Sequence, residues 1–250
     1  LFLHEVPAET IPFPMFRGEA GDNNHFDLNV YDTVNHIRSR QDWLAEYLTE
    51  NEIDTCQLVN SITLQTPIGE AVNLLRRELA LDPRWAFNLA RTDIAVGLLT
   101  EKLEQAGFFV AYNGVVGNNT QRALKVSECR GFALVNEVAP YIFVNSADSK
   151  SVQLFTLVHE AAHIMLGVSA GHAGEEITAH DAYENYCDRF AAEFLVSADV
   201  LRDTWNGDIK KHSRHFKVSE IVVARRAHDL NLLSDAAYRN FWMEYSHRPI

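Results

Sequence analysis

The sequence predicts an α+β fold in which a small mixed or antiparallel sheet packs on two functional helices, with helical regions on both sides. Apolar residues recur at helical spacing from Val30 to Leu48. Three short runs, 108–112, 131–135 and 141–144, are rich in aromatic and β-branched residues and lie between turn residues, which is typical of strands. Beyond these strands, the chain returns to long helical patterns.

These patterns divide the chain into four regions. Residues 1–28 contain three prolines and two glycines and predict an extended lead or linker from a preceding segment, since the chain opens without Met. Residues 29–106 form a helical N-terminal region, 107–200 the core with the sheet and the functional helices, and 201–250 a helical C-terminal region.

Within the N-terminal region, prolines mark two helix starts. Pro67 is expected in the first turn of a helix that ends at Leu79. Pro83 is expected to begin a third helix, which runs towards Gln105 and stops near Gly107.

The first functional helix is predicted from Ser149 to Leu166, with Gly167 at its end, and the second from about Thr178 to Leu195. The tail from Ala198 is helical, with breaks near 206–207 and 231.

Composition narrows the classes of function. With 250 residues, 47% of them apolar, the chain is an ordinary globular protein that can bury a sizeable core. A net charge of −12 excludes nonspecific nucleic-acid binding by the whole surface. No apolar run is long enough for a membrane span, so we expect no membrane association. The three cysteines are few and widely spaced, which indicates a reducing, cytoplasmic setting: Cys56, Cys129 and Cys187.

The pentapeptide His159-Glu160-Ala161-Ala162-His163 carries the strongest chemical signal. Histidines four residues apart on a helix project from one face, so their imidazoles can converge on one metal ion. Glu160 then lies beside the ion, where its carboxylate can accept a proton from a metal-bound water. We expect zinc, and the residues leave Mn²⁺ and Fe²⁺ open as alternatives.

A catalytic zinc ion normally has three protein ligands. Glu184 and Asp188 are four residues apart on the second helix and share a face. We predict Glu184 as the third ligand and Asp188 as the acceptor for the distal N–H of a liganding histidine. Glu193 is the competing ligand, at an azimuth about 180° from Glu184, so both cannot face one metal ion.

Other side chains nearby leave alternatives open. His172 and His180 are potential metal or substrate ligands, although loop histidines are more often solvent-exposed. Tyr183 is either a packed side chain or a donor to an oxyanion, and Cys187 is expected as a small buried thiol.

These motifs resemble the ImmA/IrrE metallopeptidase family. The likeness is carried by FTLVHEAAHIMLGVS (155–169) and ENYCDRFAAEFLV (184–196), and upstream by GVVGNNT (114–120) and ECRGFALVNEVAPYIFVN (128–145). The resemblance implies a zincin-like peptidase core over 107–200. It also implies that His159, His163 and Glu184 are zinc ligands and that Glu160 is the catalytic base. The sequence departs from the family at Cys187, where Ala is usual, and at 196–197, where Met-Pro is common.

The segment 209–234 is similar to a helix-turn-helix. Residues 209–228 carry six cations against Glu220, a local charge of +5. We expect a short basic helix, a turn at 217–219 and a second helix with Ser219 as N-cap and with Arg225 and Arg226 exposed. Such a unit could contact DNA through 209–234, or could be a three-helix packing unit without a DNA role.

The sequence thus predicts a zinc-dependent endopeptidase that uses a metal-activated water and Glu160 as general base. By the family resemblance, its substrate is a regulatory protein, namely a helix-turn-helix transcriptional repressor, and its setting is transcription regulation or the stress response. The alternative is a DNA- or protein-binding regulatory module, such as an antitoxin or stress-response regulator, in which the metal site is structural or sensing.

Overall fold

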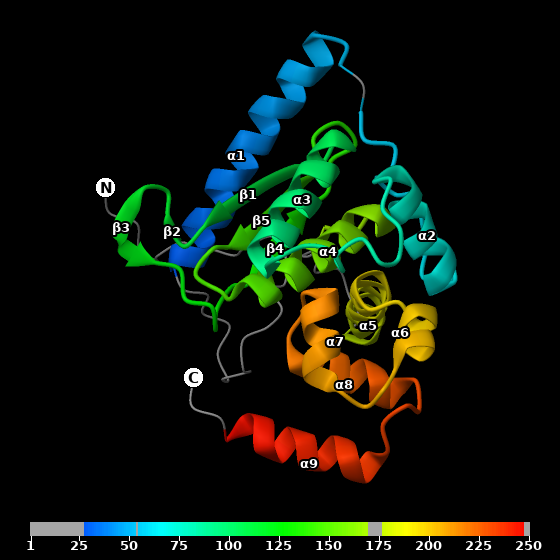
Figure 1. Ribbon diagram of the computed structural model, residues 1–250. Helices are drawn as coiled ribbons and strands as arrows, with labels where there is room; N and C mark the ends of the chain where they lie inside the picture. Colours follow the sequence, from blue (N-terminus) through cyan, green and yellow to red (C-terminus); the bar gives the residue numbers. More distant parts are fainter. Residues whose placement is uncertain (1–27, 54, 170–176, 248–250) are drawn as a thin grey trace.

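The computed structural model describes residues 28–53, 55–169 and 177–247. It confirms the α+β class, with long helices packed around a small sheet (Figure 1). The expected lead over 1–28 lies outside the described residues, apart from Leu28, which begins the first helix. Within the described ranges, no helix has both the length and the apolar character that a bilayer crossing demands.

The sheet has three strands in the order β1-β5-β4, where β1 is Phe109–Asn113, β4 is Gly131–Leu134 and β5 is Tyr141–Asn145. β1 runs parallel to β5, and β4 runs antiparallel to it. All three strands were predicted. A second pair, β2 (Val115–Val116) with β3 (Asn119–Ala123), was not predicted, because β2 has only two residues and β3 is polar throughout.

The two faces of the sheet bury different helices, because successive strand residues point to opposite sides. Phe132, Leu134 and Phe143 face α1 (Leu28–Glu50), whose Val30, Val34 and Ile37 complete a small core. Ala133, Ile142 and Val144 belong instead to the main core, together with α3 and α4. The sheet is therefore a layer between α1 and the functional helices (Figure 1).

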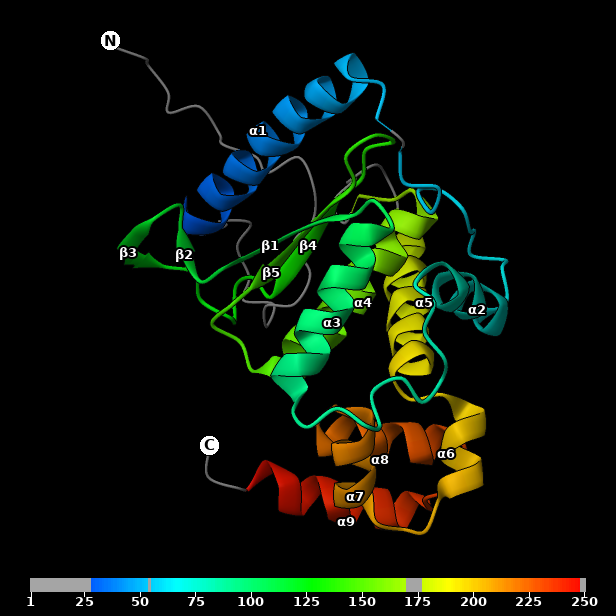
Figure 2. The same cartoon turned by 45° about the horizontal axis from the view of Figure 1, so that its top comes forward.

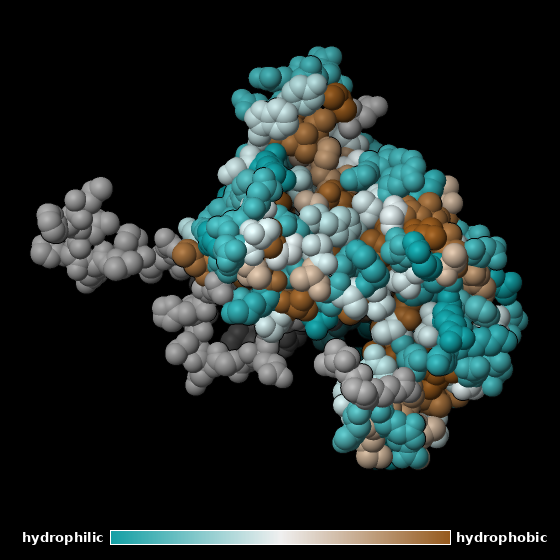
Figure 3. Space-filling view, turned by 60° about the vertical axis from the view of Figure 1, so that its left-hand side comes forward, coloured by the Kyte–Doolittle hydropathy of each residue, from teal (hydrophilic) through white to brown (hydrophobic). Residues whose placement is uncertain are grey.

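The far end of α1 extends past this layer. Trp43 and Tyr47 are 65% and 47% exposed and stack on each other with ring centroids 5.7 Å apart. The upper end of α1 is visible in Figure 3, where hydrophilic residues cover much of the surface and hydrophobic ones show in separate spots.

Two further helices pack against the two functional helices. α2 (Ile68–Glu78) begins directly after Pro67, as predicted. α3 ends at Gln105 near Gly107, also as predicted, but it begins at Thr92 and not at Pro83. Residues 83–88 form consecutive turns with i→i+3 hydrogen bonds, such as Trp85 N–H to the Asp82 carbonyl. Trp85, Phe87 and Leu89 pack on the main core from this part of the chain, and their spacing of two does not fit one face of a helix.

α4 (Lys150–Leu166) is the centre of the molecule. Every residue from Thr156 to Leu166 is buried, as expected for a helix that is covered on all sides. Gly167 ends the helix in the left-handed conformation, with φ of 70°. α5 (Ile177–Leu195) packs along α4. Both helices match the predicted ranges.

Four short helices follow: α6 (Ala198–Thr204), α7 (Ile209–Phe216), α8 (Glu220–Asp229) and α9 (Asp235–Ser246). They gather at the C-terminal end of α5 (Figure 2). The predicted breaks are confirmed, since Gly207 and Asn231 have positive φ. Ser219 occupies the N-cap position of α8 as predicted, although its side chain makes no cap hydrogen bond.

Gly131 permits the close packing of β4 against α4, and its replacement by Ala tests this packing. An added Cβ would lie 2.5 Å from Thr156 Cγ2 and 2.7 Å from the Phe143 carbonyl oxygen. We therefore expect Gly131→Ala to lower the free energy of unfolding by about 1–3 kcal/mol, measured by urea denaturation. Gly97→Ala in α3 is the matched control, because a Cβ there meets nothing within 4 Å. It should raise stability by about 0.5–1 kcal/mol. Equal stabilities of Gly131→Ala and wild type would refute the packing argument.

Candidate metal centre

The candidate metal centre lies where α4 and α5 are in contact. His159 and His163 are one turn apart on α4 and are only 7% and 1% exposed. The small residues between and opposite them let the two helices approach closely. These residues are all completely buried: Ala161, Ala162, Cys187 and Ala191.

Glu184 of α5 meets both histidines. Its Oε2 lies 3.2 Å from His159 Nε2, and its Oε1 lies 2.9 Å from His163 Nε2. The two Nε2 atoms are 3.1 Å apart. A tetrahedral zinc ion with bonds of about 2.0–2.1 Å holds its donor atoms roughly 3.3–3.4 Å apart. The structure therefore brings the three predicted ligands together at nearly the spacing that such an ion requires.

Asp188 lies behind His159, one turn along α5 from Glu184. Its Oδ1 is 3.1 Å from His159 Nδ1. A carboxylate there favours a proton on Nδ1, which leaves the Nε2 lone pair directed at Glu184 and His163. This distance is short enough for Asp188 to accept a hydrogen bond from the ring, and its role in orienting the ring stays a prediction.

Electrostatic effects at the centre oppose one another. Burial of the His159 ring lowers its pKa. Asp188 and, after it, Glu184 raise that pKa by more than burial lowers it, to about 9. Burial likewise raises the pKa of the Glu184 carboxyl, yet His159 and His163 outweigh this effect and hold that pKa well below its usual value. The site therefore stabilises an ionised carboxylate beside a positive charge, which either a protonated imidazole or a metal ion can supply.

Glu160 is buried next to the ligands, at 6% exposure. Its Oε1 is 3.7 Å from the position that a Cβ on Gly131 would take, so the carboxyl group lies under strand β4. Sequence reasoning identified Glu160 but assigned no role to Gly131, because the contact joins residues that are distant in the chain.

Glu193, the competing ligand, faces away from the centre. It pairs with Arg226 of α8, and its carboxylate oxygens lie 3.3 and 3.4 Å from the Ala198 N–H that donates to them. This pairing also corrects the expectation for Arg226, whose side chain is only 14% exposed and donates a second hydrogen bond to the Val196 carbonyl. Arg225 is exposed, as predicted.

The remaining predicted residues have separate outcomes. Cys187 is a buried free thiol, as expected, and burial with nearby carboxylates raises its pKa well above the usual value. Tyr183 is partly buried against the main core. His172 and the side chain of His180 lie outside the described residues. Sequence reasoning missed Phe155, whose ring centroid is 6.3 Å from that of His159, although its place one turn before His159 was a usable signal.

The two histidines and the carboxylate together form a group that could hold a metal ion. Residues 117–228 match the family model described as Peptidase_M78, the IrrE N-terminal-like domain, and this part of the chain belongs to the ImmA/IrrE family. The match begins within the β2–β3 pair and ends in α8, so it contains all the candidate site residues. No curated protein matches the chain.

Substitution of the two glutamates on α5 separates the ligand from its competitor. We expect Glu184→Gln to weaken zinc binding more than 100-fold, because a direct ligand outweighs the roughly 10–100-fold effect of an outer partner, which Asp188→Asn should show. Glu193→Gln should leave zinc affinity unchanged but lower the melting temperature, since Arg226 loses its partner. Competition titrations against a chromophoric chelator measure the affinities. If Glu193→Gln weakened zinc binding as much as Glu184→Gln, the assignment would be wrong.

The raised pKa of His159 also predicts how zinc affinity depends on pH. Below a pKa of about 9, a proton on His159 competes with the metal ion. Release of this proton should raise zinc affinity by up to about tenfold per pH unit between pH 6.5 and 9 and add little above pH 9. In the metal-free protein, the same raised pKa stabilises the fold below pH 6.5, and this contribution is lost as pH rises through about 9. Asp188→Asn should move the plateau to lower pH, and an unmoved plateau would contradict this account.

Proposed function

We propose that the protein is a zinc-dependent endopeptidase with a zincin-like core, which cleaves a specific regulatory protein. The observation that carries this proposal is the convergence of two imidazoles and one carboxylate within 4.8 Å of one another, with Glu160 buried beside them. The family match over the same residues supports it.

In this proposal, His159, His163 and Glu184 hold the zinc ion, and Asp188 keeps His159 in the correct tautomer. When bound, zinc lowers the pKa of a coordinated water and polarises the scissile carbonyl group. Glu160 accepts a proton from the attacking water and delivers it to the nitrogen of the leaving amine. The small exposure of Glu160 and both histidines keeps bulk water from this proton transfer.

The sheet supports an extended substrate. β4 pairs with β5 on one side only among the described strands, and Gly131 places it directly over Glu160. A substrate segment that added to the outer edge of β4 would pass the candidate site with its backbone aligned. Such pairing recognises a backbone rather than a sequence, so specificity must come from other surfaces.

The family resemblance points to a helix-turn-helix transcriptional repressor as the substrate, in transcription regulation or a stress response within the cytoplasm. The alternative is a regulatory DNA- or protein-binding module. Exposed Lys210, Lys211 and Arg214 on α7 favour DNA contact. However, Lys217 is buried and Arg226 is paired with Glu193, so the basic segment presents less free charge than its sequence indicates. We therefore favour the peptidase.

The decisive variant is Glu160→Gln, which removes the proposed base but none of the proposed ligands. We expect stoichiometric zinc to be retained and the cleavage rate to fall by about 10²–10⁴-fold. The assay is mass-spectrometric detection of new termini in a mixture of proteome-derived peptides. Glu46→Gln, on the exposed side of α1, is the matched control and should cleave at the wild-type rate. If Glu160→Gln kept full activity, the mechanism would fail. A zinc-loaded wild type that cut nothing would favour the regulatory module.

A further inference from the structure

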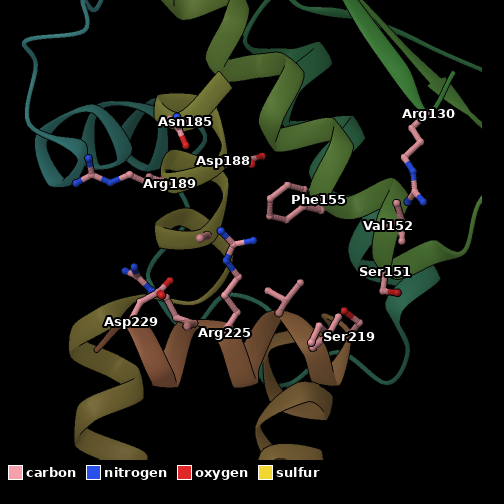
Figure 4. A pocket seen from close by; sticks show the side chains of 14 residues that line it. Arg130, Ser151, Val152, Phe155, Asn185, Asp188, Arg189, Ser219, Arg225 and Asp229 are labelled. Atoms are coloured by element: carbon pink, nitrogen blue, oxygen red, sulfur yellow. The ribbon is translucent and has the colours of Figure 1, made fainter. Parts of the chain in front are cut away.

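A cavity of about 300 Å³ lies next to the candidate metal centre, between α4, α5 and α8 (Figure 4). Asp188, which contacts His159, and Phe155 both line it. Figure 4 shows Phe155, Asp188 and Arg225 directed into the same space from three different helices. A molecule in this cavity would therefore lie within a side chain's length of the proposed reaction centre.

Arginines outnumber acidic residues in the lining of the cavity, although the protein has a net charge of −12. Four arginines line it against two aspartates. Arg226 is paired with Glu193, and Arg130 with Asp148 at 3.2 Å. Arg225 makes no ion pair or hydrogen bond with the described residues, whereas the Arg189 side chain is directed away from the space that Arg225 enters (Figure 4). The guanidinium group of Arg225 thus has unused donors in the cavity, and a carboxylate is the group that such donors bind best.

Two helix N-termini add to this preference. Ser151 and Val152 come from the first turn of α4, and Ser219 and Ile221 from the start of α8, and all four line the cavity. The positive ends of both helix dipoles therefore face it. Ser219 does not use its hydroxyl group to cap α8. These features favour an anion independently of the arginines.

Much of the remaining lining is apolar. The space also continues beyond Arg225. Val152, Phe155 and Val222 provide a surface for the methylene groups of a side chain. A second cavity, of about 550 Å³, shares Ile221 and Arg225 with the first and is lined on its far side by residues of α9. A peptide can continue into this space, so the expected anion is an acidic side chain within a chain rather than a terminal carboxylate.

We propose that this cavity is a specificity subsite, in which Arg225 binds an acidic side chain of the substrate close to the cleaved bond. The inference rests on the proposed peptidase function. The inference adds a substrate class to that function, namely a peptide segment that carries Asp or Glu at a fixed distance from the cleaved bond.

The test profiles cleavage of a random peptide library that is acetylated and amidated, so that only side chains supply carboxylates. Wild type should show Asp or Glu enriched at one position relative to the new termini, on the order of tenfold over chance. Arg225→Glu should abolish this enrichment and favour Lys or Arg there, and Arg225→Gln should abolish it without the reversal. Arg40→Glu on α1 is the matched control for charge and should keep the acidic preference. Circular dichroism verifies that each variant is folded.

A second arm separates failure of the inference from failure of the proposed function. Two acetylated, amidated hexapeptides that differ by one Glu→Gln change are titrated into the zinc-loaded protein and followed by NMR shifts of backbone amides. The Glu peptide should bind about tenfold tighter, shift the starts of α4 and α8, and lose this advantage in Arg225→Glu. The same peptides with free C-termini should bind no tighter.

The outcomes are distinct. If wild type cleaves peptides without an acidic preference, or if Arg225→Glu retains it, the subsite is refuted while the peptidase stands. If wild type cleaves nothing, the peptidase fails, and the hexapeptides alone decide the subsite: equal affinities overturn it. Tighter binding by free C-termini would assign the cavity to a terminal carboxylate and also overturn the proposal.

Discussion

The structure depends on one constraint, which is that a helix buried on all sides carries three ionisable side chains. His159, Glu160 and His163 lie in α4, where charge without a partner costs several kcal/mol. α5 supplies the compensation, because Glu184 meets both imidazoles and Asp188 meets the far side of one. The register of α4 against α5 is therefore determined by polar contacts as well as by packing. A metal ion between the two helices could bind His159, His163 and Glu184 at once.

The rest of the fold keeps these two helices in place. β4 lies close over Glu160 because Gly131 has no side chain. The far end of α5 is secured from two directions. Arg76 of α2 donates to the last carbonyls of the helix, at 2.9 Å from Glu193 O and 3.1 Å from Phe194 O, and Arg226 of α8 pairs with the Glu193 side chain. One half of α5 thus contributes to the metal centre, while the other half anchors the helix to segments at least 33 residues away.

Local patterns made the metal centre predictable from the sequence, whereas contacts distant in the chain did not. His159 with His163, and Glu184 with Asp188, are pairs four residues apart, so helix geometry alone places each pair on one face. The breaks at Gly207 and Asn231 follow from residues that tolerate positive φ. By contrast, nothing near Arg226 indicates that Glu193 binds it, and Gly131 reveals its role only beside Thr156. Residues 83–91 were mistaken for helix because Pro83 resembles a helix start, while tertiary packing of Trp85 decided the outcome.

The two consecutive arginines of α8 show how the C-terminal helices relate to the site. Residues one apart on a helix point about 100° apart, so Arg226 reaches Glu193 while Arg225 faces the cavity beside Asp188. The ion pair holds α8 against α5 and, in doing so, sets the position from which Arg225 projects. An appended DNA-binding unit would need its second helix free on the outside, yet α8 packs on α7 and α9 and lines a cavity shared with α4 and α5. The family match, which runs to residue 228, includes nearly all of α8. These contacts make α8 one wall of the cavity beside the candidate metal centre, and in the proposed peptidase such a wall would act on the choice of substrate.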